Sequence, residues 1–255
     1  FQNLSRFKRL ERHRVEEQPQ RKAFGDTKIV SAYHLATESL SSLTVSKNDV
    51  IVLYAGLPWF FQFWSRDEAI SLKALEMISP KHAQAIFWRL LQTIPDNGVI
   101  PNSADATGWI FRRAEDFIVK KRFTKEAVER VHERLKKIIH GLQIQHTTED
   151  IAIHNQRETW MDSITRGSAA VEIQAERLEL HRVEQLICNP WFYGIQSGAL
   201  VAKLAGRVRS LFWNGTYLAD SFDPITRISD WTIRPNIFLA AYLYPKLLAK
   251  SEWIR

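Results

Sequence analysis

Helical periodicity over most of the chain is the feature that most restricts its fold. It is clearest in TKEAVERVHERLKKIIHGL (residues 124–142), where apolar residues recur every three or four positions. The stripe consists of Ala127, Val128, Val131, Leu135, Ile138, Ile139 and Leu142, and Gly141 lies near the end of this helix. The same pattern predicts helices over 26–43, 66–78, 80–94, 105–119, 167–187, 189–213 and 234–248. Strands are expected only at VIVLY (50–54) and in a hairpin about Asn214-Gly215.

Composition places the chain among globular proteins, with 45% hydrophobic and 25% charged residues in 255. The excess positive charge is concentrated in residues 1–22 and 120–140. We interpret residues 1–25 as a charged N-terminal helical segment and 26–255 as one helical domain. Charge runs of this kind usually form solvated helix faces, and no nucleic-acid-binding motif accompanies them.

The single cysteine, Cys188, excludes a disulfide within the chain and suits a reducing compartment, so we expect a cytoplasmic protein. The longest apolar run, VIVLYAGLPWFFQFW, is too short to span a membrane and is interrupted by Gly56 and Pro58. We therefore expect neither a membrane nor a nucleic acid as partner.

Motifs for metal, nucleotide or serine-nucleophile chemistry are missing from the sequence. His140, His146 and His154 do not have metal-ligand spacing, and neither a G-x-S-x-G elbow nor a glycine-rich phosphate loop occurs. We expect no cofactor. What remains is a set of acidic residues close to tryptophans or at helix starts, in WSRDE (64–68), SADATGW (103–109), RETWMD (157–162) and VEIQ (171–174).

Carboxylates near aromatic side chains suit sugar chemistry. An apolar wall raises the pKa of a carboxyl group, which then acts as a general acid near neutral pH. An Arg beside an Asp, as in Arg66-Asp67, is expected to stay charged and to offer donors and acceptors to vicinal hydroxyls. The structural alternative for each segment alone is a helix cap or a buried ion pair.

Six segments in order make the chain recognisable: AGLPWFFQFWSRDEAI, ADATGWIF, ETWMD, RGSAAVEIQA, FWNGTYLAD and IRPNIFLAAYLYP. Together they resemble the amylo-α-1,6-glucosidase domain of glycogen debranching enzymes, from about residue 26 to the end. The resemblance implies an all-α fold, an (α/α)6 toroid of helical hairpins with minor β-hairpins in its loops. Its site would lie at the mouth formed by the N-terminal loops of the inner helices. Glucoamylase-like and trehalase-like enzymes share this architecture.

The resemblance assigns roles to single residues. Arg66 and Asp67 would grip the hydroxyls of the non-reducing-end glucose between walls formed by Trp59 and Trp64. In the same segment, Phe60, Phe61 and Phe63 are expected in the core.

Further along the chain, Asp162 would be the general acid, beside Trp160. Asp105 and Trp109 would form a second sugar-facing segment, with Glu158 and Glu172 as polar lining or supporting groups. Arg234 and Asn236, in the RPN motif, are expected to be mostly structural.

The implied reaction is hydrolysis of the α-1,6-linked glucose left on a trimmed branch of glycogen or a limit dextrin, with inversion. Inversion needs a second carboxylate, about 6.5–9.5 Å from the acid, to activate water. We expect that base beyond Arg255 and an incomplete toroid, with Glu172 and Asp220 as poor substitutes.

Two local departures from the family pattern stand out. Only three residues separate Asp162 from Arg166, which puts the selectivity for the α-1,6 linkage in question. Glu176-Arg177 follows VEIQA, where an apolar residue is usual.

Other functions remain open at this stage. They are a glucoamylase- or trehalase-like α-glucosidase, a non-catalytic glucan-binding partial barrel, and a helical scaffold that binds an acidic partner through residues 1–22 and 120–140. An open barrel would expose apolar helix faces, which a homo-oligomer would cover.

Overall fold

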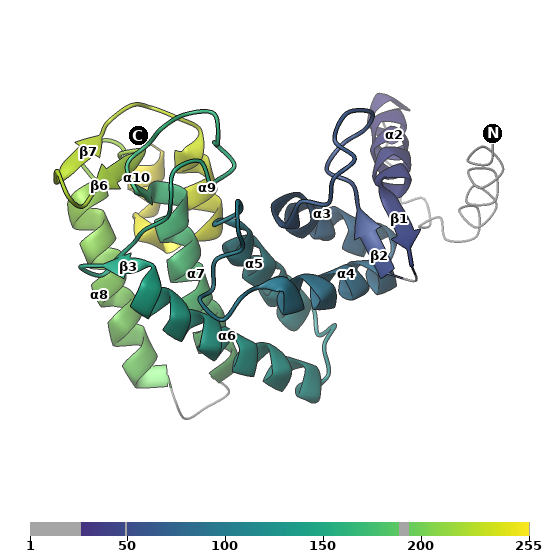
Figure 1. Ribbon diagram of the computed structural model, residues 1–255, viewed down its shortest axis with the longest axis horizontal. Helices are drawn as coiled ribbons and strands as arrows, with labels where there is room; N and C mark the ends of the chain where they lie inside the picture. Colours follow the sequence, from purple (N-terminus) through teal and green to yellow (C-terminus); the bar gives the residue numbers. More distant parts are fainter. Residues whose placement is uncertain (1–26, 49, 189–193, 255) are drawn as a thin grey trace. The chain divides into compact units, whose positions relative to one another are not determined.

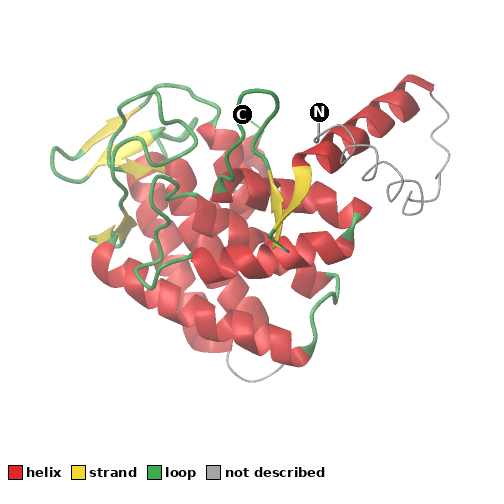
Figure 2. Ribbon diagram, turned by 45° about the vertical axis from the view of Figure 1, so that its right-hand side comes forward, coloured by secondary structure: helices red, strands yellow, loops and turns green. Residues whose placement is uncertain are grey.

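Helices dominate the computed structural model, which describes residues 27–48, 50–188 and 194–254 (Figures 1 and 2). The chain divides into two units, one up to Arg89 and one from Leu90 onward. The predicted charged segment, residues 1–25, and the basic run 1–22 lie outside the described residues.

The first unit consists of helix α2 (Thr27–Leu43), strands β1 (Thr44–Lys47) and β2 (Val50–Leu53), helix α3 (Ser65–Ile78) and most of α4 (Pro80–Thr93). β1 and β2 pair as an antiparallel hairpin, which confirms the predicted strand at VIVLY. The buried carboxylate of Glu68 accepts a hydrogen bond from the Leu53 N–H, 2.9 Å away, and forms an ion pair with Arg89. This one side chain therefore ties β2, α3 and α4 together.

The second unit is built around helix α7 (Val171–Cys188). It contacts α5 (Ala106–Val119), α6 (Lys125–Gln145), α8 (Gly194–Phe212) and α9 (Asn236–Leu243). The short helices η1 (Pro245–Leu247) and α10 (Lys250–Trp253) follow α9. Ten residues of α7, from Val171 to Val183, are buried, as expected of a helix surrounded by others.

Short antiparallel strands connect these helices. β3 (Thr147–Thr148) pairs with β4 (Ile151–Ala152), and β5 (Ala169–Ala170), β6 (Ser221–Asp223) and β7 (Ile228–Asp230) form a sheet in that order. The expected helix over 167–187 thus begins at Val171, because Ala169 and Ala170 pair with β6. About Asn214-Gly215 the chain turns with Gly215 at φ 96°, and a single bridge joins Trp213 to Leu218.

Gly141 lies near the end of α6, as predicted. α6 continues to Gln145, and a Cβ atom at Gly141 would lie 1.9 Å from the Asp96 carbonyl oxygen. Glycine is therefore required here for the close approach of a neighbouring backbone. The predicted class, an all-α fold with minor hairpins, is confirmed by the nine α-helices of the described chain and is consistent with a toroid of helical hairpins.

Candidate active site

The predicted acid, Asp162, lies in a loop between β4 and β5 that is fixed by hydrogen bonds at several points. The Ala104 N–H donates to the Glu158 carbonyl (2.7 Å), and the Trp160 N–H donates to the Asp105 carboxylate (2.8 Å). The Trp160 indole N–H donates to the side-chain oxygen of Asn236 (2.7 Å). Asp162, two residues after Trp160, is exposed. The loop therefore presents a carboxylate to solvent from a fixed backbone.

The two sides of this loop are also joined to each other. The Gln156 side-chain amide donates to the Arg166 carbonyl (2.5 Å), and its oxygen accepts from the Arg166 N–H (3.1 Å). Between them, Arg157 adopts φ 62°, a left-handed conformation that is uncommon for a residue other than glycine. The Gln156 clamp closes the loop over ten residues and limits the positions that Asp162 can take.

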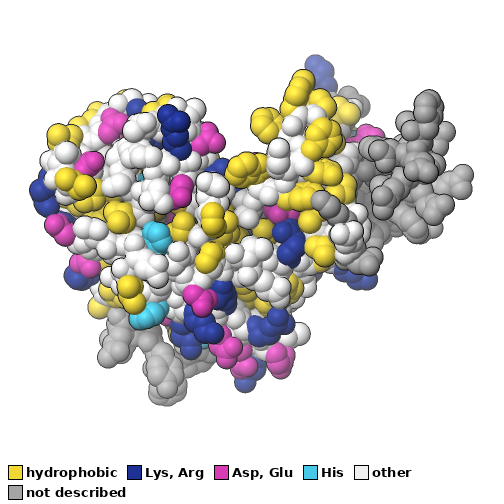
Figure 3. All heavy atoms as spheres, in the orientation of Figure 1, with side chains coloured by type: hydrophobic (Ala, Val, Ile, Leu, Met, Phe, Trp, Pro, Cys, Tyr) yellow, Lys and Arg dark blue, Asp and Glu magenta, His cyan; other side chains and the backbone are white. Residues whose placement is uncertain are grey.

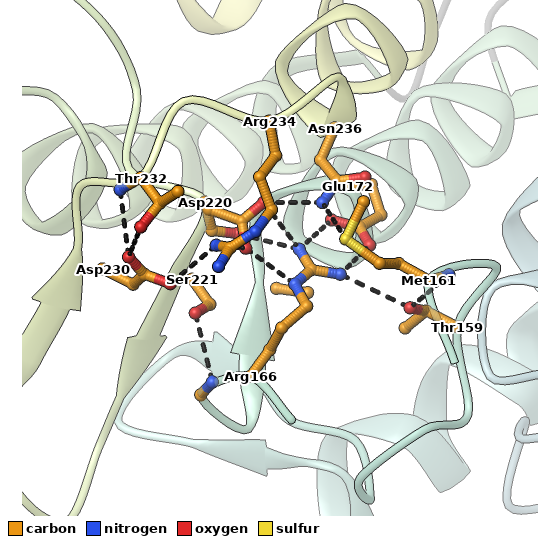
Figure 4. Close-up of polar contacts among 12 residues, drawn as sticks. Thr159, Met161, Arg166, Glu172, Asp220, Ser221, Asp230, Thr232, Arg234 and Asn236 are labelled. Atoms are coloured by element: carbon orange, nitrogen blue, oxygen red, sulfur yellow. Dashed lines mark hydrogen bonds and ion pairs between the residues drawn. The ribbon is translucent and has the colours of Figure 1, made fainter. Parts of the chain in front are cut away.

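Buried Arg166 is the centre of the polar network beneath the loop (Figure 4). Its Nε donates to Asp220 (2.7 Å), and its two terminal nitrogens donate to the two oxygens of Glu172 (2.6 and 2.8 Å). Further bonds reach the Asp220 carbonyl (3.0 Å) and the Thr159 hydroxyl (3.4 Å). Burial alone would lower the pKa of Arg166, but the bonds and charges of Glu172 and Asp220 raise it above its usual value. All five N–H donors of this guanidinium therefore have acceptors.

The RPN motif supplies the other side of this network. Arg234 donates to Asp220 (2.8 Å) and to Asp230 (2.7 Å), and the buried Asn236 amide donates to Asp220 (2.6 Å). Burial acts to raise the pKa of Asp230, but the hydrogen bonds from Thr232 and Arg234 outweigh it and lower this pKa to about 2. Asn236 thus joins Asp220 to Trp160, so α9 helps to hold the Asp162 loop.

The positions of Glu172 and Asp220 decide their chemistry. Both are buried, and both carboxylates are occupied by Arg166. Neither is placed to accept a proton from water or to contact a sugar. Of the two roles predicted for Glu172, the role as polar lining is wrong and the supporting role fits its burial against Arg166. Its rejection as the base also agrees with the structure.

The prediction of Asp105 and Trp109 as a sugar-facing segment is also wrong, because both side chains lie inside the protein. Asp105 is 0% exposed and Trp109 is 6% exposed, so neither side chain faces a sugar. Asp105 positions the Trp160 backbone instead, and Trp109 stacks on Tyr242 with ring centroids 5.8 Å apart. Glu158 is half-buried on the loop, where its carboxylate accepts from the Asn155 N–H (3.3 Å).

The remaining predicted site residues, Trp59, Trp64, Arg66 and Asp67, belong to the first unit. Trp59 is 80% exposed at the tip of a loop whose Gly56 and Phe60 exchange backbone hydrogen bonds (2.9 and 3.2 Å). Hydrophobic side chains gather on the surface of this unit (Figure 3). The placement of Phe60 and Phe61 in the core was wrong: they are 62% and 58% exposed, because the tight turn directs this tip outward. Phe63 is half-buried and stacks on Tyr54.

Arg66 and Asp67 lie in the first turn of α3 and are half-buried. An acidic residue here is favoured by the partial positive charge of a helix N-terminus. Burial raises the pKa of Asp67, and the charge of Arg66 offsets this only in part. The pair is thus less strongly held in its charged form than the sequence suggested.

Sequence reasoning did not foresee that Arg166 is the hub of the network. The available signal was indirect: buried acids need a basic partner, and Arg166 stands just before the motif that contains Glu172. Thr159, Asp230 and Gln156 gave no such signal. In the part of the chain that the structure describes, no group of three or more His, Cys, Asp or Glu side chains is arranged to hold a metal ion.

With this geometry in view, comparison with known proteins identifies the family. A family model described as amylo-alpha-1,6-glucosidase matches residues 31–254. The chain belongs to this family. A comparison with individually curated proteins gave no match. The family assignment gives the chain a glycosidase-like domain of the kind found in glycogen debranching enzymes, and it covers both units. No helix among the described residues is long and apolar enough to cross a membrane.

Proposed function

We propose that this protein is an amylo-α-1,6-glucosidase that removes the α-1,6-linked glucose at branch stubs of glycogen or related α-glucans, with inversion and without a cofactor. Its place of action would be the cytoplasm, where such glucans are stored. The observation that carries the proposal is Asp162, an exposed carboxylate on a loop fixed from both sides, in a chain of this family.

In this proposal Asp162 protonates the oxygen of the glycosidic bond as the bond breaks. A fixed backbone matters for this step, because a general acid must lie within hydrogen-bond reach of the leaving oxygen. The bonds of Trp160 to Asp105 and Asn236 supply that fixation immediately before Asp162. Arg66 and Asp67 would hold the glucose hydroxyls, and Trp59 and Trp64 would give the sugar ring flat apolar surfaces.

The base that activates water is neither Glu172 nor Asp220, since each is held by the Arg166 guanidinium. Removing either would cost stability by leaving Arg166 short of a partner. Loss of glucose release in a Glu172→Gln or Asp220→Asn variant would therefore have to be separated from misfolding before it was read as loss of a base.

The test is glucose release from a phosphorylase limit dextrin by the Asp162→Asn variant. We expect turnover to fall by about a hundredfold or more, the usual contribution of a general acid, while glucan binding persists. Glu133→Gln, an exposed acid on α6, is the matched control and should keep full turnover. Unchanged glucose release in Asp162→Asn would remove Asp162 from this role.

A panel of isomaltose-type, maltose-type and trehalose substrates tests the linkage. Preference for the α-1,6 bond supports the proposal, whereas preference for the α-1,4 bond or for trehalose indicates the related glucosidase activities. Glucan binding without turnover on any substrate would indicate a binding module.

A further inference from the structure

An aromatic pair, Tyr217 and Trp231, lies in the connection between helices α8 and α9. The two ring centroids are 6.1 Å apart and the ring planes are nearly perpendicular. Trp231 is 38% exposed and Tyr217 is half-buried. Within the described residues, neither the Trp231 indole N–H nor the Tyr217 hydroxyl has a hydrogen-bond partner. The pair thus combines a flat apolar surface with unused polar groups, the two features that suit a sugar ring and its hydroxyls.

Backbone hydrogen bonds place this pair near the start of α7. Trp231 directly follows Asp230, the last residue of β7. The Asp220 N–H donates to the Asp230 carbonyl (2.8 Å), and the Val171 N–H donates to the Asp220 carbonyl (3.0 Å). Because hydrogen-bonded strands lie about 4.8 Å apart, the Asp230 backbone is roughly 10 Å from the first residue of α7.

Side-chain bonds continue this link to the network beneath the Asp162 loop. Arg234 donates to Asp230 (2.7 Å) and to Asp220 (2.8 Å), as Figure 4 shows. Asp220 is bound in turn by Arg166, at the base of the Asp162 loop. That loop leads through β5 into α7, and the connection that carries both rings leads into α9. The aromatic pair and Asp162 are therefore carried by two loops that share one polar network.

Local hydrogen bonds fix the backbone at both rings. The Asn214 side-chain oxygen accepts from the N–H groups of Thr216 (2.9 Å) and Tyr217 (3.0 Å). On the other side, the Asp230 carboxylate accepts from the Thr232 N–H (3.0 Å), so the chain on either side of Trp231 is held. An aromatic surface on a fixed backbone loses little conformational freedom when a ligand binds.

We propose that Tyr217 and Trp231 bind the α-1,4-linked main chain of the glucan, on the leaving-group side of the bond that Asp162 would cleave. The inference rests on the proposed function and names the part of the substrate that this second loop recognises. A main chain of several glucose units extends beyond the single glucose of the stub and reaches a neighbouring loop. Asp230 and Arg234 neutralise each other beside the rings, which suits an uncharged polymer.

The structural alternative is that Trp231 only anchors the turn that carries Tyr217. Trp231→Ala would then lower Tm and weaken the binding of every ligand alike. On our proposal it weakens the binding of long α-1,4 glucans selectively, because a single glucose held at the stub site does not reach Trp231. Trp231→Phe, which keeps a flat ring, should restore part of the affinity.

The direct test is calorimetric titration of the whole chain with maltoheptaose and with glucose. We expect Trp231→Ala to weaken maltoheptaose binding by about tenfold, the range for loss of a large aromatic contact, and to leave glucose binding unchanged. Ile225→Ser is the matched control, because Ile225 is an apolar residue, 92% exposed, in the turn between β6 and β7. It should bind both ligands as the original protein does.

Kinetics separate this role from that of Asp162. In Trp231→Ala the KM for a phosphorylase limit dextrin should rise about tenfold with kcat unchanged, since the lost contact is made equally before and during the reaction. The KM for isomaltose, which has no main chain, should not change.

Three results would overturn the proposal: no binding of maltoheptaose by the original protein, equal affinity of Trp231→Ala for it, or equal losses for glucose and maltoheptaose. The titration needs no turnover, so the two proposals fail separately. If the original protein bound maltoheptaose through Trp231 but released no glucose from any substrate, the glucan site would stand and the proposed hydrolysis would not.

Discussion

The network around Arg166 and the loop that carries Trp59 place opposite kinds of residue where they are least expected. Arg166, Glu172 and Asp220 are charged and almost fully buried, whereas Trp59, Phe60 and Phe61 are aromatic and exposed. A buried ion cluster is costly unless every member is paired, so it holds one geometry. More than half of the surface of each of these exposed rings is left for a ligand or a partner. The Arg166 network holds the Asp162 loop in position, and the Trp59 loop is available to bind a ligand.

The largest expected effect comes from disrupting the network around Arg166. Arg166→Met leaves the buried carboxylate of Glu172 without its partner and leaves Asp220 with Arg234 as its one remaining ion-pair partner among the described residues, so the free energy of unfolding should fall by about 3–5 kcal/mol. Urea denaturation measures the loss, with Lys137→Met as a control expected within about 0.5 kcal/mol of the original protein. A loss below about 1 kcal/mol would show that the cluster is not organised as described.

A backbone position beside Arg166 should give the next largest effect. A Cβ at Gly167 would lie 2.8 Å from the Phe222 carbonyl oxygen, so Gly167→Ala should lose about 1–3 kcal/mol of unfolding free energy. Gly206→Ala, in α8 with nothing within 4 Å of the new Cβ, should instead gain about 0.5–1 kcal/mol. Equal effects of the two substitutions in thermal or urea unfolding would contradict the packing of β5 against β6.

Substitutions in the loop that carries Trp59 should change the affinity for glucan and not the stability of the protein. Trp59→Ala is expected to weaken glucan binding by about tenfold, the range for loss of a large aromatic contact, with Tm unchanged. Phe60→Ser, also exposed but with no assigned sugar contact, is the matched control. If Phe60→Ser weakened affinity as much as Trp59→Ala, the apolar surface that contacts the sugar would extend beyond the predicted tryptophans.

The smallest expected effect is a pH dependence of stability from Asp230. Its folded pKa, about 2, lies below its ordinary value of 3.8. Its contribution is therefore complete above pH 3.8 and is lost as the pH falls toward 2. Between these pH values the original protein should lose more Tm than Asp230→Asn does. If Tm fell equally with pH in the two proteins, Asp230 would not be paired with Arg234 as described.

Much of this fold follows from local sequence pattern. The stripe from Ala127 to Leu142 predicts α6, and the VIVLY run predicts β2. Both predictions depend only on the spacing and type of residues that are close together in the sequence. The need for glycine at position 141 has a tertiary cause, the approach of the Asp96 carbonyl, which no local pattern reports.

The site was predicted less completely, for the same reason. Short motifs selected Asp105, Glu172 and Asn236 but did not predict their burial. For Glu172 that burial depends on its pairing with Arg166, which in turn bonds to Asp220, 54 positions further along the sequence. The exposure of Phe60 likewise depends on how the turn directs its tip, and composition favours the opposite placement.

We propose that Glu172 and Asp220 form a scaffold and that water attacks the sugar directly. Proton NMR of the first glucose released from an α-1,6 stub, recorded before mutarotation, tests this most directly. We expect β-glucose, the product of inversion. Initial release of α-glucose would contradict it, since retention requires an enzyme carboxylate to act as nucleophile close to Asp162.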